Sequence, residues 1–177
     1  MKQLNNAFAT WFYLGQIPKA PGTWGTLGGL AFVYIVSLHW EDVFGHNIDL
    51  WQFIVFTFAL FLLGVLSAGK FDKDHGTKDS KMIVIDEVVG IMITCMPMVF
   101  LADRYEVPLA FDGWKQPLIA FILFRFFDIL KPWPISLADQ KIKGGLGVML
   151  DDVLAGIAAA TCFVIIGYTF HEYIYVG

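Results

Sequence analysis

The sequence predicts an all-α integral membrane protein, a compact bundle of about five transmembrane helices with a short N-terminal interfacial helix. Of its 177 residues, 57% are hydrophobic and only 28 are charged, the sum of 12 Lys and Arg and 16 Asp and Glu. About a quarter of the residues of an ordinary soluble domain are charged. A soluble domain of this length would leave much of this apolar composition facing water. The length suits a single domain over residues 1–177.

The composition also excludes several classes of protein. A formal net charge of −4 argues against a basic surface that binds nucleic acid, so we expect no nucleic-acid partner. The chain is too hydrophobic to be disordered. Its two cysteines, Cys95 and Cys162, lie in apolar runs, where cysteine is usually a small core residue, and they are too few for a disulfide scaffold. The expected partner is the lipid bilayer, and no pattern indicates an obligate protein partner.

The first expected element is a short amphipathic helix, Leu4 to Leu14. This segment lacks the uninterrupted apolar core and the small-residue cleavage site of a secretory signal. We expect it to lie at the membrane interface, with Trp11 and Tyr13 as aromatic anchors.

Five apolar runs follow, and each is about long enough to cross a bilayer, which takes about 20 residues. The second and fifth are the clearest, and the first is short enough that it could be re-entrant. The runs are Trp24 to Trp40, Leu50 to Gly69, Met82 to Ala102, Trp114 to Leu130 and Val148 to Phe170.

The distribution of Lys and Arg orients these runs, because positive loops stay in the cytoplasm. The loop from His39 to Asp49 and the C-terminal tail contain neither residue. The intervening loops on the other side are basic. We therefore expect a multi-pass membrane protein with its N-terminus inside and its C-terminus outside. The basic loop residues are Lys70, Lys73, Lys78, Lys81, Lys131, Lys141 and Lys143.

Ionisable residues that enter the apolar runs all fall on the cytoplasmic side in this arrangement. Charges inside membrane spans are costly and are candidates for a functional site. Several carboxylates from three helices would repel one another, and a divalent cation relieves that repulsion. Oxygen ligands alone favour Mg²⁺, or Mn²⁺, over zinc. The residues are Asp86 and Glu87, about two turns into the third run, Arg125 and Asp128 near the end of the fourth, and Asp151 and Asp152 at the start of the fifth.

The segment FRFFDILKPWP favours a phosphate clamp. Arg125, Asp128 and Lys131 are three residues apart, so they would lie along one helix face. Pro132 and Pro134 would then end the helix and hold Lys131 at the surface. Two cations that flank a carboxylate suit a phosphate beside a metal ligand.

Two glycine-rich segments are candidates for substrate binding. KGGLGVMLDD leads into the fifth run, where Lys143 and the backbone N–H groups of Gly144 and Gly145 would favour an anion. PGTWGTLGG places Thr23 and Thr26 at the cytoplasmic start of the first run.

Structural explanations exist for each pattern alone. Arg125 with Asp128 fits an intrahelical pair, Asp151 or Asp152 fits a helix-start charge, and PGTWGTLGG fits a turn and helix start. The segment FDKDHGT is similar to a haloacid-dehalogenase phosphatase loop, but its threonine is one position late and no buried strand precedes it. DEVVG and DDVLAG form a short internal echo in which Asp86 and Asp152 each precede a glycine by four residues, a spacing that favours close helix approach.

Four motifs in order resemble the phosphatidylglycerophosphatase A family, whose bacterial members remove the terminal phosphate of phosphatidylglycerophosphate. The resemblance implies phosphatidylglycerol and inorganic phosphate as products, and Mg²⁺ as cofactor. Together with the orientation, it implies the bacterial inner (cytoplasmic) membrane as location, with the active site facing the cytoplasm. The motifs are PGTWGT (Pro21 to Thr26), IVIDEVVG (Ile83 to Gly90), FRFFDILKPWP (Phe124 to Pro134) and GGLGVMLDDVLAG (Gly144 to Gly156). The catalytic residues that it implies are Asp86, Glu87, Arg125, Asp128, Lys131, Asp139, Asp151 and Asp152.

The chain departs from the family pattern at two places. Asp79, Ser80 and Lys81 stand where the family often has Asp, then His or Pro, then Gly, so the turn chemistry differs. Lys143 stands where a His is common.

Metal-assisted phosphomonoester hydrolysis is the favoured activity. Asp86, Glu87, Asp128 and Asp152 would hold Mg²⁺ directly or through water, and Arg125 and Lys131 would neutralise the phosphoryl group. Either water or a carboxylate could be the nucleophile. One alternative is another membrane lipid-phosphate phosphatase or a CDP-alcohol phosphotransferase, whose DxxDGxxAR signature is absent here. A small carboxylate-based ion transporter is the other, but it would need ionisable groups at mid-membrane or at both faces.

Overall fold

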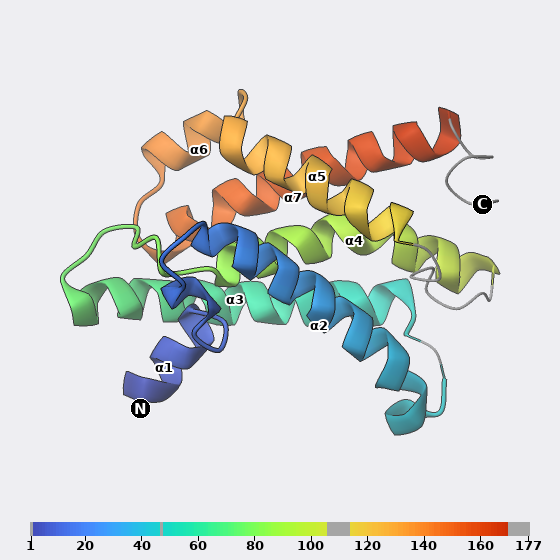
Figure 1. The fold of residues 1–177 in the computed structure, drawn as a ribbon, viewed down its shortest axis with the longest axis horizontal. Coiled ribbons are helices and arrows are strands. Elements are labelled where there is room, and N and C mark those ends of the chain that lie inside the picture. Colours follow the sequence, from blue (N-terminus) through green and yellow to red (C-terminus); the bar gives the residue numbers. More distant parts are fainter. Residues whose placement is uncertain (1, 47, 106–113, 170–177) are drawn as a thin grey trace.

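The computed structural model describes residues 2–46, 48–105 and 114–169. Over these residues the chain is all helical, as predicted, and no strand occurs (Figure 1). In chain order the elements are α1 (Lys2–Ala9), the 3-10 helix η1 (Leu14–Gln16), α2 (Pro21–Phe44), α3 (Leu50–His75), α4 (Ile85–Tyr105), α5 (Lys115–Leu130), α6 (Ile135–Lys141) and α7 (Gly145–Thr169).

Helix α4 is the centre of the bundle. It packs against α2, α3, α5 and α7, while α1 lies on α3 and α6 lies on α7. Many of its apolar residues, among them Val88, Ile91 and Cys95, are fully buried. A helix that is apolar on every side is stable in such a position because its neighbours cover it all round. The acidic pair at its start is thereby brought among the surrounding helices.

Three helices are long and apolar enough to cross a membrane, namely α3, α4 up to Arg104, and α7. The predicted number of about five crossings is not confirmed. Helix α5 has 16 residues, a length of about 24 Å that falls short of a hydrocarbon core about 30 Å thick. Helix α2 is long enough, but glycine and threonine dilute the apolar character of its first turns. The expected fifth run ends at Phe170, which lies outside the described residues.

The N-terminal prediction is partly wrong. Helix α1 ends at Ala9 instead of Leu14, because Trp11, Phe12 and Tyr13 take positive φ angles that a right-handed helix does not allow. The chain then turns, and the side chain of Trp11 is buried against the ring of Phe32 at 5.1 Å. Trp11 is therefore a packing residue and not an interfacial anchor, whereas Tyr13 is exposed.

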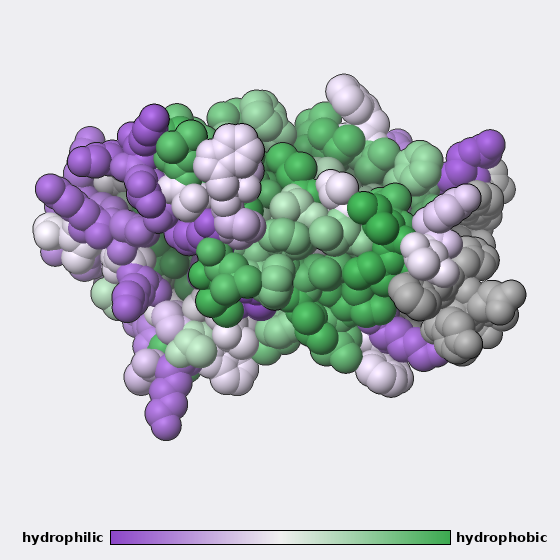
Figure 2. Space-filling model, turned by 90° about the horizontal axis from the view of Figure 1, so that it is seen from above, coloured by the Kyte–Doolittle hydropathy of each residue, from purple (hydrophilic) through white to green (hydrophobic). Residues whose placement is uncertain are grey.

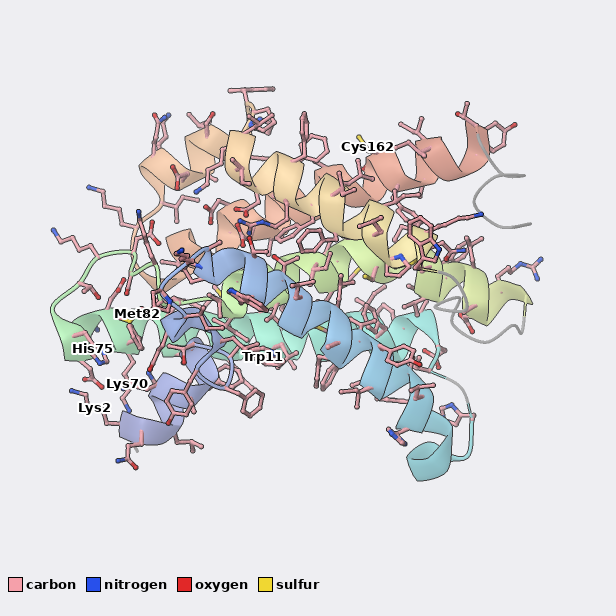
Figure 3. The ribbon with its side chains drawn as sticks, in the orientation of Figure 1. Lys2, Trp11, Lys70, His75, Met82 and Cys162 are labelled. Atoms are coloured by element: carbon pink, nitrogen blue, oxygen red, sulfur yellow. The ribbon has the colours of Figure 1, made fainter. Side chains whose placement is uncertain are left out.

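The surface is divided along the long axis of the molecule. Figure 2 shows most of the hydrophilic side chains at one end, fewer at the opposite end, and a broad apolar surface over the middle. Helix α1, the last turns of α3 and helix α6 lie at this polar end, and Figure 3 marks it with Lys2, Lys70 and His75. The Lys2 side chain donates a hydrogen bond to the carbonyl of Asp74. Basic segments that are far apart in the sequence thus share one end, as the sequence predicts.

Helices α4 and α7 cross at two glycines. A Cβ on Gly156 would collide with the carbonyl oxygen of Gly90, and a Cβ on Gly90 would lie 3.0 Å from the carbonyl oxygen of Asp152. Glycine at both positions lets the two backbones approach closely. These are the two glycines of the internal echo, so the echo marks the helix crossing next to the acidic residues.

Candidate active site

The acidic pair Asp86 and Glu87 lies in the first turn of α4. The sequence placed it about two turns into a longer run, and this is wrong because the residues before Ile85 are not helical. That preceding segment is fixed by a hydrogen bond from the Val84 N–H to the Ala9 carbonyl, 3.0 Å long. Carboxylates at a helix start also face the positive end of the helix dipole.

Asp152 on α7 joins this pair across the helix crossing. One carboxylate oxygen from each of Asp86, Glu87 and Asp152 lies within 4.8 Å of the other two. The cluster also has unsatisfied acceptors, since Asp86 Oδ1, Glu87 Oε2 and Asp152 Oδ2 are buried without a hydrogen-bond partner. Buried acceptors of this kind are costly unless a cation or a donor meets them. The donor set therefore fits a hard divalent cation such as Mg²⁺.

Arg125 borders this cluster from α5. Its Nη1 lies 2.6 Å from Asp128 Oδ2 and 4.0 Å from Glu87 Oε1. Asp128 is close enough to Glu87 and Asp152 for their charges to interact. The side chains of Arg125, Glu87 and Asp128 are mostly buried. The intrahelical pair of Arg125 with Asp128, one of the sequence interpretations, is confirmed. This pair lies next to the cluster of Asp86, Glu87 and Asp152.

The start of α2 forms one wall beside Arg125. The segment PGTWGTLGG is the first part of a helix, with Pro21 at its first position, where a missing N–H is tolerated. Thr26 is fully buried, and it accepts a hydrogen bond from Arg125 Nη1 at 3.5 Å. A Cβ on Gly22 would collide with Glu87 Oε1 and lie 3.0 Å from Arg125 Nη1.

Lys131 makes a second group of ion pairs. Its Nζ lies 2.7 Å from Asp139 Oδ1 on α6 and 2.5 Å from Asp151 Oδ2 on α7. Partial burial lowers the pKa of Lys131, but its hydrogen bonds to Asp139 and Asp151 outweigh that effect and raise the pKa overall. Lys131 thus stays cationic at any ordinary pH.

The expectation that Lys131 shares a helix face with Arg125 and Asp128 is wrong. Helix α5 ends at Leu130, as the two prolines predict, and Lys131 takes a left-handed conformation with φ 41°. Its side chain consequently bonds α6 and α7, while Arg125 bonds Asp128 within α5. The two cations are held by different carboxylates.

The other residues that the sequence predicts to bind substrate also lie near the polar end. Thr23 is half-buried in the first turn of α2, and Lys143 and Gly144 are exposed just before α7. Gly145 packs closely on α3, since a Cβ there would lie 2.8 Å from the Gly69 nitrogen. A role for these residues in substrate binding stays a prediction.

The acidic segment after Phe71 has a structural explanation. Asp72 lies in the last turn of α3 and accepts hydrogen bonds from the Thr77 hydroxyl and the Asp79 N–H, each 2.7 Å long. It thereby shapes the loop that leads to α4. A helical Asp72 does not fit the strand-following loop of a haloacid-dehalogenase phosphatase.

Sequence reasoning missed Gly22 as a site residue. The signal was its spacing, because Gly22 and Thr26 are four residues apart and therefore lie on the same face of a helix. This spacing points to a shared face only when the glycine-rich segment is helical, whereas the sequence also fitted a turn there.

The fold and the site together define a class of protein. Several buried carboxylates and a guanidinium stand at the polar end of an apolar helical bundle, which suits phosphoryl chemistry on a lipid headgroup. A model of the family described as phosphatidylglycerophosphatase A matches residues 7–167. The chain belongs to the phosphatidylglycerophosphatase A family and is a membrane protein.

Similar proteins agree with this assignment. The chain is 41% identical over 161 residues to a phosphatidylglycerophosphatase A of Haemophilus influenzae, covering 90% of this chain and 86% of that protein. It is 32% identical to a phosphatidylglycerophosphatase A of Escherichia coli, covering 90% and 81%. It is 38% identical to a Bacteroides thetaiotaomicron protein with the provisional name phosphatidylinositol-3-phosphatase, covering 84% of each chain. No solved structure gives a significant match.

Proposed function

We propose that the protein hydrolyses the terminal phosphate of phosphatidylglycerophosphate and releases phosphatidylglycerol and inorganic phosphate. Family membership and the names of two relatives support this activity over a CDP-alcohol phosphotransferase or an ion transporter. The observation that carries the mechanism is the meeting of Asp86, Glu87 and Asp152 beside Arg125. In the reaction, the oxygen of water forms a bond to phosphorus, the bond from phosphorus to the glycerol oxygen breaks, and that oxygen takes a proton.

The cofactor in this proposal is Mg²⁺, with Mn²⁺ as a substitute. Asp86, Glu87 and Asp152 would hold the ion through their unsatisfied oxygens, and Asp128 would stay with Arg125 next to it. A bound divalent ion polarises phosphoryl oxygens and orients the attacking group. The three carboxylates also make the site too negative for a phosphate without such an ion.

The chain's own residues would bind and orient the phosphate. Arg125 offers a planar fork of N–H donors, of which Nη1 is taken by Asp128, so its remaining donors can face the phosphoryl oxygens. Lys131 would hold the Asp151 side chain in place, and it could contact the phosphate only after its ion pair with Asp139 broke. The diacylglycerol tails would stay along the apolar surface of the bundle, so only the headgroup need enter the polar end.

The proposed location is the bacterial inner membrane, with the polar end in the cytoplasm. The clustering of basic residues at that end supports this orientation through the positive-inside rule. The headgroup would then be reached from the cytoplasmic leaflet.

Phosphate release by the purified protein tests the activity. We expect release from phosphatidylglycerophosphate with Mg²⁺, and little release when a chelator replaces the ion. Phosphatidylinositol 3-phosphate should be compared in parallel because of the third relative. Faster release from the inositol lipid would refute phosphatidylglycerophosphate as the preferred substrate, but it would still support a phosphatase activity. Absence of release from either lipid, with folded protein, would refute the function.

A further inference from the structure

We propose that Thr26 is a positioning residue that fixes the guanidinium of Arg125, and that it does not itself bind the substrate. This inference rests on the proposed function, because it concerns how that function's cation is held. Thr26 has an exposed fraction of 0%. A headgroup that enters from water or lipid therefore meets Arg125 and not this hydroxyl.

The hydrogen bonds of Thr26 define its role. Its hydroxyl donates to the Gly22 carbonyl at 2.8 Å, and it accepts from Arg125 Nη1 at 3.5 Å. A hydroxyl has a single proton, so the bond to Gly22 turns its lone pairs toward the guanidinium. Thr26 is thus an uncharged acceptor for Arg125.

An uncharged acceptor has a specific use here. The other groups near Nη1 are the carboxylates of Asp128 and Glu87. A carboxylate holds the guanidinium but also neutralises its charge, which weakens its attraction for a phosphoryl group. The Thr26 hydroxyl holds the guanidinium without adding a second negative charge to that of Asp128.

Gly22 also lies close to the Arg125 side chain. It lies one turn before Thr26, and a Cβ there would collide with Glu87 Oε1 and lie 3.0 Å from Arg125 Nη1. The backbone of α2 therefore approaches both side chains directly. Thr26 and Gly22 form one helix face whose shape fits the Arg125 and Glu87 heads.

Thr57 provides a matched comparison. It is also buried, and its hydroxyl donates to the carbonyl four residues earlier, that of Phe53, at 2.8 Å. Among the described residues its hydroxyl makes no hydrogen bond to an ionisable group. The helix-internal bond alone is therefore a common structural device, and the contact with Arg125 distinguishes Thr26.

The proposal is tested by kcat/KM for phosphate release in three variants, Thr26→Val, Thr26→Ser and Thr57→Val. Valine keeps the volume but removes the acceptor, and we expect kcat/KM for phosphate release to fall about tenfold, the loss typical of one hydrogen bond to a charged group. Serine keeps the hydroxyl and should restore most of that loss. Thr57→Val should have a kcat/KM close to that of the wild-type protein. An unchanged kcat/KM in Thr26→Val, or an equal loss in Thr57→Val, would overturn the proposal.

A double-mutant cycle with Arg125→Gln separates positioning from substrate binding. If Thr26 acts through Arg125, Thr26→Val should cause no further loss in the Arg125→Gln background. An equal loss in both backgrounds would mean that Thr26 acts independently, which contradicts the proposal.

The same cycle can be measured by melting temperature, which does not depend on activity. Coupling between the two substitutions supports the contact, and additive shifts refute it. If the wild-type protein releases no phosphate from either lipid, the proposed function fails, and the melting cycle still decides the role of Thr26.

Discussion

Arg125 and Asp128 form an ion pair of 2.6 Å within one turn of α5, and this pair faces the three-carboxylate cluster formed by α4 and α7. The relationship joins a cation next to the cluster to an anion of its own helix. It fixes the direction of the guanidinium before any substrate arrives. Preorganised charge of this kind costs no rearrangement during the reaction.

Replacement of Arg125 by Lys should lower the rate of phosphate release about 10- to 100-fold, because a single ammonium cannot keep Asp128 and also offer two parallel donors to phosphate. The rate on phosphatidylglycerophosphate is the measurement. Arg104→Lys is the matched control, since Arg104 is exposed in the last turn of α4. Similar rates for both variants would contradict the role of the guanidinium fork.

Magnesium should raise the melting temperature of the purified protein, because it binds the folded cluster and not the unfolded chain. At about 100 times its dissociation constant the gain is about 2.7 kcal/mol, or about 5–10 °C for a chain of this size. A chelator should reverse the shift. Asp152→Asn should abolish it, and Asp103→Asn, at the other end of α4, should keep it. A full shift in the Asp152 variant would mean that the ion binds elsewhere.

Lys131→Met should destabilise the protein more than Asp139→Asn does. Loss of Lys131 leaves Asp151, whose side chain is 9% exposed, without its cation, at a cost of about 1–3 kcal/mol after allowance for the partial exposure of Lys131. The Asp139 side chain is 36% exposed, so its pair contributes about 0–1 kcal/mol. Denaturation in detergent measures both. Equal losses would show that the contact with Asp151 contributes little.

The contribution of Lys131 should not vary between pH 7 and pH 9. Its pKa is raised in the folded protein, so the stabilisation is fully present below the ordinary value of 10.5 and is lost only as the pH rises through the higher folded value. Unfolding of the wild-type and Lys131→Met proteins at both pH values tests this. A difference that disappears by pH 9 would refute it.

Cysteine labelling tests the orientation. Two cysteine variants are made in a Cys162→Ser background. His46→Cys, between α2 and α3, should react with an impermeant maleimide added to intact cells. Lys78→Cys, at the polar end, should be protected. The reverse pattern would place the polar end outside. The remaining Cys95 is fully buried and should not interfere.

Much of the fold followed from the sequence because apolar runs and proline stops act locally. The start of α3 at Leu50 and the end of α5 at Leu130 were predicted, and both have local causes, a capping box at Asp49 and the KPWP segment. The burial of Trp11 could not be predicted, because it depends on Phe32 of another helix.

The sequence predicted which residues meet at the candidate site better than it predicted which side chains pair with one another. Resemblance and one-sided charge indicated Asp86, Glu87, Arg125 and Asp152. The left-handed conformation of Lys131, which sends its side chain to α6 and α7, has no signal in residue spacing. The contact of Gly22 with Glu87 likewise depends on how α2 and α4 cross.

The central claim is tested most directly by the rate of phosphate release from phosphatidylglycerophosphate at saturating Mg²⁺. The variants to measure are Asp86→Asn, Glu87→Gln and Asp152→Asn. Each substitution keeps the shape of the side chain and removes its charge. The account predicts that each variant folds, with a rate more than about 100-fold below that of the wild-type protein, since a metal ion supplies several kcal/mol to phosphoryl transfer. Asp103→Asn should have the wild-type rate. Near-normal rates in all three cluster variants would contradict the assignment of this cluster as the catalytic site.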